Sequence, residues 1–255
     1  MKKLYLSGLF VLLIQPFLMA QKMADSLPQF FQPSVLIELF SSEGCSSCPV
    51  ADAFMKEILA ISDSSKTAVY VLDYHVDIWN RSGWVDPYSD STYSLRQQNY
   101  VFKKKFAAMY TPMAIINGGN KDYAGSDKGG IGRKVSELLN KPSKHFIRTA
   151  VAPATNEDSI VIAYNIWGNI DSCDFHAVLV QREIKNMVTA GENKNKVLEH
   201  HNVVKKMISI PLKMNKGYVK MGISRDLNVE SYRLIVFMQH RRTWDIMASD
   251  QLSFD

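Results

Sequence analysis

The sequence of 255 residues contains only three cysteines, which excludes a small scaffold held together by several disulfide bonds. After residue 20 it has no stretch of about 20 consecutive apolar residues, so no membrane-spanning helix is expected there. Neither charge sign dominates, because the formal net charge is +5 and the densest basic run is Lys103–Lys105; no nucleic-acid partner is expected. What remains, with 46% hydrophobic residues, is the composition of an ordinary globular protein with a substantial core.

The first 20 residues have the pattern of a secretory signal peptide. Lys2 and Lys3 precede a mostly apolar run that is interrupted by Pro16 and ends in Met19–Ala20. This pattern is typical of a cleaved signal, whereas an uncleaved anchor, the alternative, usually has a longer apolar run. We therefore expect the protein to be exported, either to the periplasm or as a secreted protein, without stable membrane insertion once residues 1–20 are removed.

Residues 33–140 alternate strand and helix signals, which predicts an α/β domain with a mixed sheet and a helical insert at residues 76–100. The expected elements are strand Val35–Phe40, helix Cys48–Ile61, strand Thr67–His75, a longer helix with Leu95, Phe102, Phe106 and Met109 on its buried side, strands Met113–Ile116 and Asp122–Ala124, and helix Ile131–Leu139.

Residues 145–255 have a different sequence pattern: short apolar runs are separated by Gly, Asn, Asp and Pro, and no helical pattern is present. The runs are Phe146–Ala152, Ile160–Trp167, Phe175–Arg182, Val203–Pro211, Tyr218–Ile223, Tyr232–His240 and Asp245–Leu252. Seven short strands over about 110 residues predict a β-sandwich-like all-β domain.

Two of the cysteines form the motif Cys45-Ser46-Ser47-Cys48 between a predicted strand and a predicted helix. A thiolate at a helix N-terminus is stabilised by unpaired backbone N–H groups and by the helix dipole. We expect Cys45 to be the exposed, attacking thiol and Cys48 to be the resolving thiol, with Ser46 and Ser47 helping to set the reduction potential. Pro49 is compatible with the first helical turn. A passive structural disulfide is the alternative.

A second signal is Tyr110-Thr111-Pro112, directly before the third predicted strand. We expect Pro112 to follow a cis peptide bond and to face the cysteine pair, where Thr111 and Pro112 would meet an extended partner segment. The two motifs at these relative positions resemble the thioredoxin fold.

Longer blocks of the sequence resemble a secreted thioredoxin-like family catalogued as domain of unknown function 1223. The blocks are ELFSSEGCSSCPVAD (38–52), HVDIWNRSGWVDPYSDSTYSLRQQNY (75–100), YTPMAIING (110–118) and GENKNKVLEHHNVVK (191–205). The resemblance implies a thioredoxin-like fold, but the activity of the family is unsettled. Val50 and Met113 depart from the expected proline and glutamine, so family-typical substrate contacts are not carried over at Met113.

Two acidic residues lie near the cysteine motif. Glu38 interrupts an apolar strand, and the sequence leaves two roles open for it: a proton shuttle for the resolving thiol, or a hydrogen-bonded acid in the core. Glu43 lies close to Cys45 in a predicted turn, where its charge would oppose thiolate formation. We expect Glu43 to be solvated.

His75 and Asp77 end the second predicted strand, at the edge of the sheet where the Cys45 loop also lies. His75 is a candidate general base or a metal ligand, but a structural histidine held by Asp77 is the favoured interpretation. Trp79 and Trp84, in the insert that follows, are candidates for lining a substrate groove or for capping the sheet.

Three polar features fall in the C-terminal half. Glu192 and Asn193 are expected in an ordinary polar loop, although that loop could instead lean on the first domain and shape the groove. His200 and His201 should point to opposite faces, which argues against both binding one metal. Cys173 lies in an acidic, turn-like segment and is expected to be unreactive.

The hypothesis from the sequence is therefore an exported thiol–disulfide oxidoreductase that acts on a protein or small thiol/disulfide partner and needs no cofactor beyond its redox-active disulfide. One alternative is a binding module for a soft metal such as Cu(I), with Cys45 and Cys48 joined by His75 or Met113. Another is a non-catalytic interaction domain with a structural disulfide.

Overall fold

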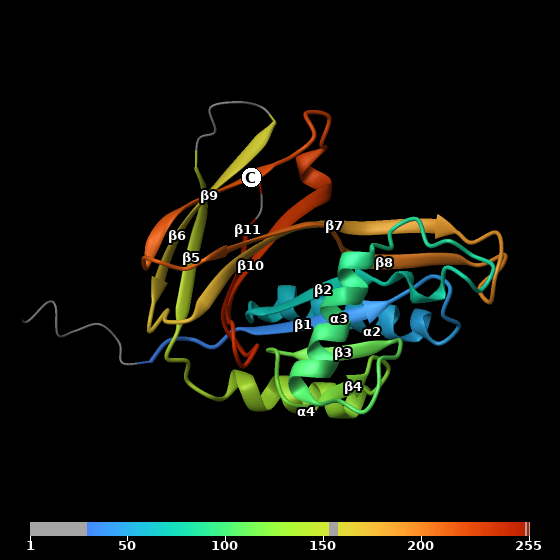
Figure 1. Cartoon of the computed structure of the whole chain (residues 1–255), viewed down its shortest axis with the longest axis horizontal. Helices are drawn as coiled ribbons and strands as arrows, with labels where there is room; N and C mark the ends of the chain where they lie inside the picture. Colours follow the sequence, from blue (N-terminus) through green and yellow to red (C-terminus); the bar gives the residue numbers. More distant parts are fainter. Residues whose placement is uncertain (1–29, 153–157, 253, 255) are drawn as a thin grey trace, which may run out of the picture.

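The computed structural model describes residues 30–152, 158–252 and 254 (Figure 1); the expected signal at residues 1–20 lies outside them. In chain order the elements are β1 Val35–Ser41, α2 Cys48–Ser65, β2 Val69–His75, η1 Asp77–Trp79, α3 Ser91–Lys104, β3 Met113–Ile116, β4 Asp122–Ala124, α4 Lys128–Leu139, β5 Phe146–Ala152, β6 Ser159–Trp167, β7 Cys173–Met187, β8 Val197–Pro211, β9 Lys216–Gly222, η2 Val229–Ser231, β10 Tyr232–His240 and β11 Ile246–Leu252.

The strand β1 is buried along its whole length because both of its faces are covered. It pairs in parallel with β2 and antiparallel with β3, which in turn pairs antiparallel with β4. Ile37 and Leu39 pack with α2 and α4 on one face, and Leu36 and Phe40 pack with α3 on the other. A continuous apolar run is what a strand buried on both faces requires.

Two local features set the limits of α2, the helix that follows the cysteine motif. Pro49 lies in its first turn, where the missing N–H group has no helical partner to lose. The helix ends at Lys66, whose φ of 55° places it in the left-handed region. The helix start therefore falls at Cys48, as the sequence predicts.

The strands of both halves of the chain join in one eight-stranded sheet, in the order β11-β10-β7-β8-β2-β1-β3-β4. The junction is the parallel pairing of β2 with β8, at Asp73 and Val203. The β-rich half thus continues the sheet of the α/β half, and the expected division near residues 141–145 does not separate two sheets. The sequence pattern could not show this junction because strand pairing between distant segments leaves no local signal.

A second sheet, of order β5-β6-β9, packs against the β7, β10 and β11 end of the first sheet. The side chains between the two layers are apolar and include Ile162, Phe175 and Val236. This part of the molecule has two β layers, but one of them is shared with the α/β half, so the expected separate β-sandwich-like domain is not confirmed. Figure 1 shows the smaller sheet at one end and the long β7–β8 hairpin reaching the other.

The buried side of α3 differs from the prediction. Leu95 is 54% exposed and Phe102 is 85% exposed, while Phe106 and Met109 lie beyond the helix end and are half-buried. The buried helix residues are Tyr93, Gln97 and Tyr100. These side chains can be buried because each has a donor group that finds a partner: the backbone oxygens of Val204 and Tyr110, and the Glu38 carboxylate. Only the Gln97 Oε1 atom among these groups has no partner within the described residues. Hydrophobicity alone therefore selects the wrong helix face.

Within the described part of the chain, no helix combines the length and the apolar character needed to cross a membrane.

Candidate functional site

Cys45 and Cys48 form a disulfide between the end of β1 and the first turn of α2, with their Cα atoms 5.5 Å apart. The Cys45 backbone N–H donates to the Ser42 carbonyl, which closes the turn that presents the pair. The Ser47 hydroxyl lies 3.4 Å from the Cys45 sulfur. Thiol chemistry at Cys45 would therefore take place beside a helix N-terminus and a hydroxyl group, both of which stabilise a thiolate.

The Thr111–Pro112 peptide bond is cis, as predicted. Trp79 connects this segment to the cysteine loop: its indole N–H donates to the Thr111 hydroxyl at 2.7 Å, and a Cβ atom added to Gly44 would lie only 2.9 Å from the Trp79 Cβ. Gly44 thus permits Trp79 to pack directly against the residue before Cys45. Both tryptophans of the insert are half-buried, and Trp79 lies between the two motifs.

Cys45 is 3% exposed, so the expectation of an exposed attacking thiol is wrong. The cover comes from the turn between β7 and β8. The Asn193 amide donates to the carbonyl oxygens of Glu43 and Cys45, at 2.9 Å each, and the Glu192 carboxylate accepts from the Ser46 N–H at 3.0 Å. These residues form the tip of the hairpin, so the ordinary polar loop expected for Glu192 and Asn193 is a contact surface for the cysteine loop.

Glu43 is fully buried, and the expectation that it is solvated is also wrong. Its carboxylate accepts hydrogen bonds from the Trp84 indole at 2.9 Å and from the Asn186 amide at 2.9 and 3.0 Å. Trp84, proposed from the sequence as a groove residue, thus holds Glu43. The strand β7 that supplies Asn186 begins well over a hundred residues later, which explains why the local sequence around Glu43 gave no sign of burial.

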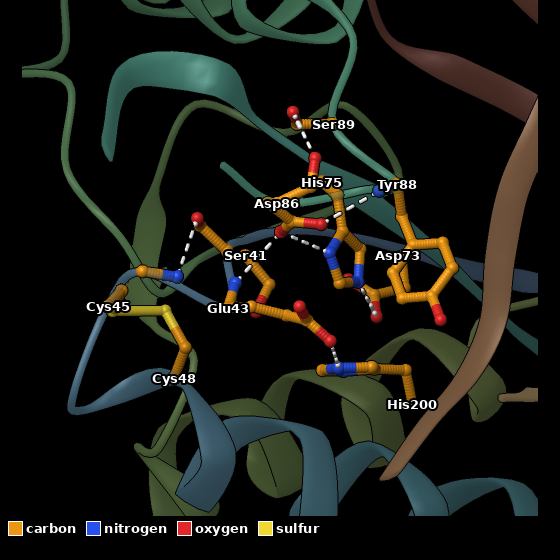
Figure 2. Close-up of polar contacts among 12 residues, drawn as sticks. Ser41, Glu43, Cys45, Cys48, Asp73, His75, Asp86, Tyr88, Ser89 and His200 are labelled. Carbon is orange, nitrogen blue, oxygen red and sulfur yellow. Dashed lines mark hydrogen bonds and ion pairs between the residues drawn. A yellow bond between two sulfur atoms is a disulfide. The ribbon is translucent and has the colours of Figure 1, made fainter. Parts of the chain in front are cut away.

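A cluster of six buried ionisable side chains lies beside the disulfide (Figure 2). We call Glu43, Asp52, Asp73, His75, Asp86 and His200 the acid–histidine cluster. His75 is not held by Asp77. Its Nδ1 lies 2.7 Å from Asp86 Oδ2 and its Nε2 lies 3.2 Å from Asp73 Oδ2, while Asp77 pairs with Ser94 on α3. A structural His75 is therefore held by Asp73 and Asp86 and not by Asp77.

His200 is the second histidine of the acid–histidine cluster. Its Nδ1 lies 3.1 Å from Asp52 Oδ2 and its Nε2 lies 3.3 Å from Glu43 Oε1. The His75 and His200 rings meet edge to face, with centroids 4.6 Å apart. His201 points the other way and contacts Glu199 near the surface, as the strand alternation predicts. The two adjacent histidines therefore have separate environments.

The carboxylates control how these histidines titrate. Burial acts to lower the pKa of His75, but Asp73 and Asp86 outweigh it and hold the pKa well above the usual value. Burial likewise opposes the charged form of His200, yet hydrogen bonds to Asp52 and Glu43 raise its pKa to about 9. Burial raises the pKa of Asp52, and His200 opposes that rise.

Glu38 lies on the opposite face of β1, which α3 covers. Its carboxylate accepts from the Arg96 guanidinium at 2.6 Å and from the Tyr100 hydroxyl, and Gln239 donates to the same hydroxyl. Among the described contacts, none joins Glu38 to either cysteine. Of the two roles that the sequence leaves open for Glu38, these contacts favour the hydrogen-bonded acid in the core.

The remaining predicted residues are not brought to the disulfide. Cys173 is a free, buried thiol, and burial raises its pKa above the usual value, which agrees with the expected lack of reactivity. Met113 is buried and its sulfur lies 3.3 Å from the Gln97 amide. In the part of the chain that the structure describes, no hydrogen bond or ion pair joins His75 or Met113 to a cysteine.

Sequence reasoning missed three members of the acid–histidine cluster: Asp52, Asp73 and Asp86. Each has a weak signal that is visible only in retrospect, because each is an acid within or beside a mostly apolar segment. Asp73 lies inside the buried strand β2, and Asp52 lies one turn after Cys48 on α2. An acid inside a buried strand needs a partner, and Asp73 has His75 two positions later on the same strand. The histidine partner of Asp52, His200, is 148 positions away.

The fold and this site define a mixed α/β protein with helices, additional β-strands and a Cys-x-x-C disulfide at the start of a helix. The family described as "Protein of unknown function (DUF1223)" matches residues 36–239, and the chain belongs to that family.

One solved structure has a similar fold over most of its length. Protein AGR_C_4864 from Agrobacterium tumefaciens, known from its crystal structure, is 24% identical to this chain, with a TM-score of 0.68; the match covers 87% of this chain and 94% of that one. A domain of the outer membrane lipoprotein Omp28 from Porphyromonas gingivalis is 14% identical, over 44% of this chain and 89% of that one, with a TM-score of only 0.26. No curated protein matches the chain.

Proposed function

We propose that the protein is an exported thiol–disulfide oxidoreductase with a thioredoxin-like unit at residues 33–140. The observation that carries the proposal is the position of the Cys45–Cys48 disulfide, at the N-terminus of α2 and one tryptophan away from the cis Thr111–Pro112 segment. Exchange chemistry needs a sulfur whose thiolate is stabilised. The helix start and the Ser47 hydroxyl supply that stabilisation at Cys45.

The arrangement of the first half supports a thioredoxin-like unit. Its strands lie in the order β2-β1-β3-β4, with β1 parallel to β2 and antiparallel to β3. The helices α2 and α4 pack on one face of these strands and α3 on the other. A βαβ unit followed by a β-hairpin and a final helix is the order that the resemblance to thioredoxin implies.

In the proposed exchange, the reduced protein attacks a partner disulfide through the Cys45 thiolate. A Cys45–partner disulfide forms as the partner's own sulfur–sulfur bond breaks and one partner thiolate leaves. The Cys48 thiolate then attacks Cys45, which releases the second partner thiolate and restores the Cys45–Cys48 disulfide. Two electrons pass from the protein to the partner, and the two thiol protons pass to the partner thiolates; reversing the steps oxidises a partner dithiol.

The buried state of Cys45 sets a condition on this chemistry. A partner sulfur must reach Cys45 in line with the disulfide, but Cys45 is 3% exposed and its loop is held by Asn193 and Glu192. The proposal therefore requires the tip of the β7–β8 hairpin to separate from the cysteine loop before a mixed disulfide forms. Pro112 is buried as well, so the proposal also requires the segment that would meet the partner backbone to become accessible.

The test is redox titration followed by trapping. The Cys45–Cys48 pair is equilibrated with glutathione buffers, and the Cys48→Ala variant is then incubated with a disulfide peptide. We expect a reversible two-electron titration and an accumulated mixed disulfide at Cys45. The matched control is Cys173→Ser, which removes the third cysteine and should change neither result. If Cys48→Ala traps no mixed disulfide after the hairpin contact is weakened by Asn193→Ala, the oxidoreductase proposal is wrong.

The burial of Cys45 favours a second candidate, a non-catalytic interaction domain whose disulfide stays closed. This candidate predicts that the native protein keeps its disulfide in mild reductant and loses it only on unfolding. No comparable observation favours a Cu(I) site built from the cysteines and His75. Within the described contacts, the two ring nitrogens of His75 lie against Asp73 and Asp86. Export is proposed from residues 1–20 alone, and its test is N-terminal sequencing of the protein recovered outside the cytoplasm.

A further inference from the structure

We propose that Asp73, His75 and His200 form a binding site for a divalent transition-metal ion of the Zn²⁺ type, separate from the disulfide. Each residue offers one ligand atom, and these atoms lie within 4.8 Å of one another in the interior. Imidazole nitrogen and carboxylate oxygen are ligands that Zn²⁺ accepts in proteins. The inference does not depend on the proposed redox function, since it uses neither sulfur atom.

The spacing of Asp73 and His75 matches the spacing of adjacent ligands. Asp73 Oδ2 and His75 Nε2 are 3.2 Å apart, and two atoms bound tetrahedrally at about 2.0–2.1 Å from one zinc ion are about 3.3 Å apart. Both residues lie on β2 with one residue between them, so their side chains share a face of the strand. The backbone thus presents the two ligands together without a special turn.

His200 approaches from the other half of the sheet. It lies on β8, the strand that joins β2 at Asp73 and Val203, and its ring meets the His75 ring edge to face. Both of its nitrogens have a carboxylate partner, Asp52 at 3.1 Å and Glu43 at 3.3 Å. Whichever nitrogen binds the ion, the other keeps a carboxylate partner.

The surrounding groups orient these ligands as outer partners do in metal sites. His75 Nδ1 lies 2.7 Å from Asp86, and Asp86 is in turn fixed by the backbone N–H groups of Glu43 and Tyr88 at 2.8 and 2.9 Å. A carboxylate on the far nitrogen fixes the tautomer of a metal-binding histidine and raises its basicity. Both histidines therefore have the carboxylate–histidine arrangement before any ion binds.

A separate observation points to a missing partner at Asp73. This residue is 1% exposed, and its Oδ1 atom has no hydrogen-bond partner among the described residues. A buried carboxylate oxygen without a partner is costly. A cation bound at Asp73 would remove that cost, and four carboxylates facing two imidazoles favour a cation over an anion.

A pocket lies between α2 and β8, and Asp52 in its wall contacts His200. The pocket has a volume of about 290 Å³ and is lined by Pro49, Asp52, Lys56, Leu198 and His201, among other residues. Because Asp52 lies both in the pocket wall and beside His200, an ion entering from solvent meets a carboxylate before it meets the histidines.

The experiment uses the full protein with its disulfide closed, stripped with a chelator and titrated with Zn²⁺ by calorimetry. We expect one equivalent to bind. Affinity should fall about 100-fold or more in His200→Asn and about 10- to 100-fold in Asp86→Asn. The matched control is His201→Asn, the neighbouring histidine on the opposite face of β8, which should bind as the wild type does.

The double variant Cys45→Ser, Cys48→Ser keeps the inference distinct from the redox proposal, because it should still bind one equivalent. Unchanged affinity in His200→Asn, or loss of binding in the double variant, would overturn the site. Should His200→Asn fail to fold, Co²⁺ added to the wild type decides the matter. Tetrahedral d–d absorption without a thiolate charge-transfer band supports the site, and an unchanged spectrum contradicts it.

Discussion

Two regions of this molecule bury histidine in opposite ways. Beside the disulfide, His75 and His200 have carboxylates at both ring nitrogens, and their pKa values are raised. On β7, His176 stacks on Phe237 and has the Ser209 hydroxyl at 2.7 Å. Burial, together with the charge of Arg96, holds the pKa of His176 well below the usual value. The partners, rather than the depth of burial, decide the charge of each ring.

The comparison also separates two kinds of thiol. Cys173 packs in the apolar layer between the two sheets and is not part of a disulfide, and its thiol donates to the Asp171 carbonyl at 3.5 Å. Cys45 is almost as deeply buried, but polar groups from three segments surround it: the Ser47 hydroxyl, the Asn193 amide and Trp79 beside Gly44. Burial in polar surroundings leaves chemistry available once the cover moves, whereas burial in an apolar layer does not.

The largest effect is expected when the His200 side chain is removed from the metal-free protein. His200→Ala leaves Asp52 and Glu43 facing each other without their shared partner. We expect the free energy of unfolding to fall by about 3–5 kcal/mol, the usual cost of breaking a buried pair. His201→Ala, the control on the opposite face, should cost less than about 1 kcal/mol. Urea unfolding of both variants measures the difference; equal costs would show that the buried contacts of His200 contribute nothing.

The acid dependence of stability tests the other histidine. Because the pKa of His176 is lowered in the folded protein, its stabilising contribution is present above the unfolded pKa of about 6.5 and is lost as the pH falls below that value. The loss approaches about 1.4 kcal/mol per pH unit. Phe237 and Ser209 cannot compensate a charged ring, and Arg96 opposes it.

In His176→Gln, the stability curve between about pH 6.5 and pH 5 should flatten by this amount relative to the wild type. Subtracting the two curves removes the contribution of the carboxylates, which both proteins share. The stability of the wild type minus that of His176→Gln should fall as the pH drops from about 6.5 to 5; a difference that rises as the pH drops would mean that the sign of the shift is wrong.

Weakening the cover of Cys45 should sharpen the contrast between the two thiol environments. Asn193→Ala removes two hydrogen bonds to the cysteine loop, each worth about 1 kcal/mol. We expect the disulfide to be reduced by a water-soluble phosphine about 10-fold faster or more. The control is Lys194→Ala, an exposed neighbour in the same turn, which should leave the rate unchanged.

The smallest effect concerns Ser47. Its hydroxyl lies beside the Cys45 sulfur, so Ser47→Ala should raise the pKa of the reduced Cys45 thiol by about half a unit to one unit. The pH dependence of alkylation measures this change. Ser46→Ala is the control, since no described contact joins the Ser46 side chain to that sulfur, and an equal shift in both variants would remove the role of the Ser47 hydroxyl.

The sequence predicts the positions of most strands well because each signal is local. The apolar run at Val35–Phe40, the helix start at Cys48 and the cis bond before Pro112 depend on neighbouring residues. Glu43 was misjudged because its partners, Trp84, Asn186 and His200, lie 41 to 157 positions away. Leu95 and Phe102 were misjudged because α3 buries side chains with polar ends. Single-residue hydrophobicity carries neither kind of information.

The cover of Cys45 has a consequence for the order of events during synthesis. Asn193 lies 148 positions after Cys45, so at a synthesis rate of about 5–20 residues per second the cysteines precede their cover by roughly 7 to 30 s. During that interval the cysteine loop lacks its contacts with Glu192 and Asn193. Once β8 has paired with β2, the hairpin tip closes over the pair. The pairing of β2 with β8 therefore comes after the cysteines are made. The Cys45–Cys48 disulfide has time to form before the hairpin tip contacts the cysteine loop.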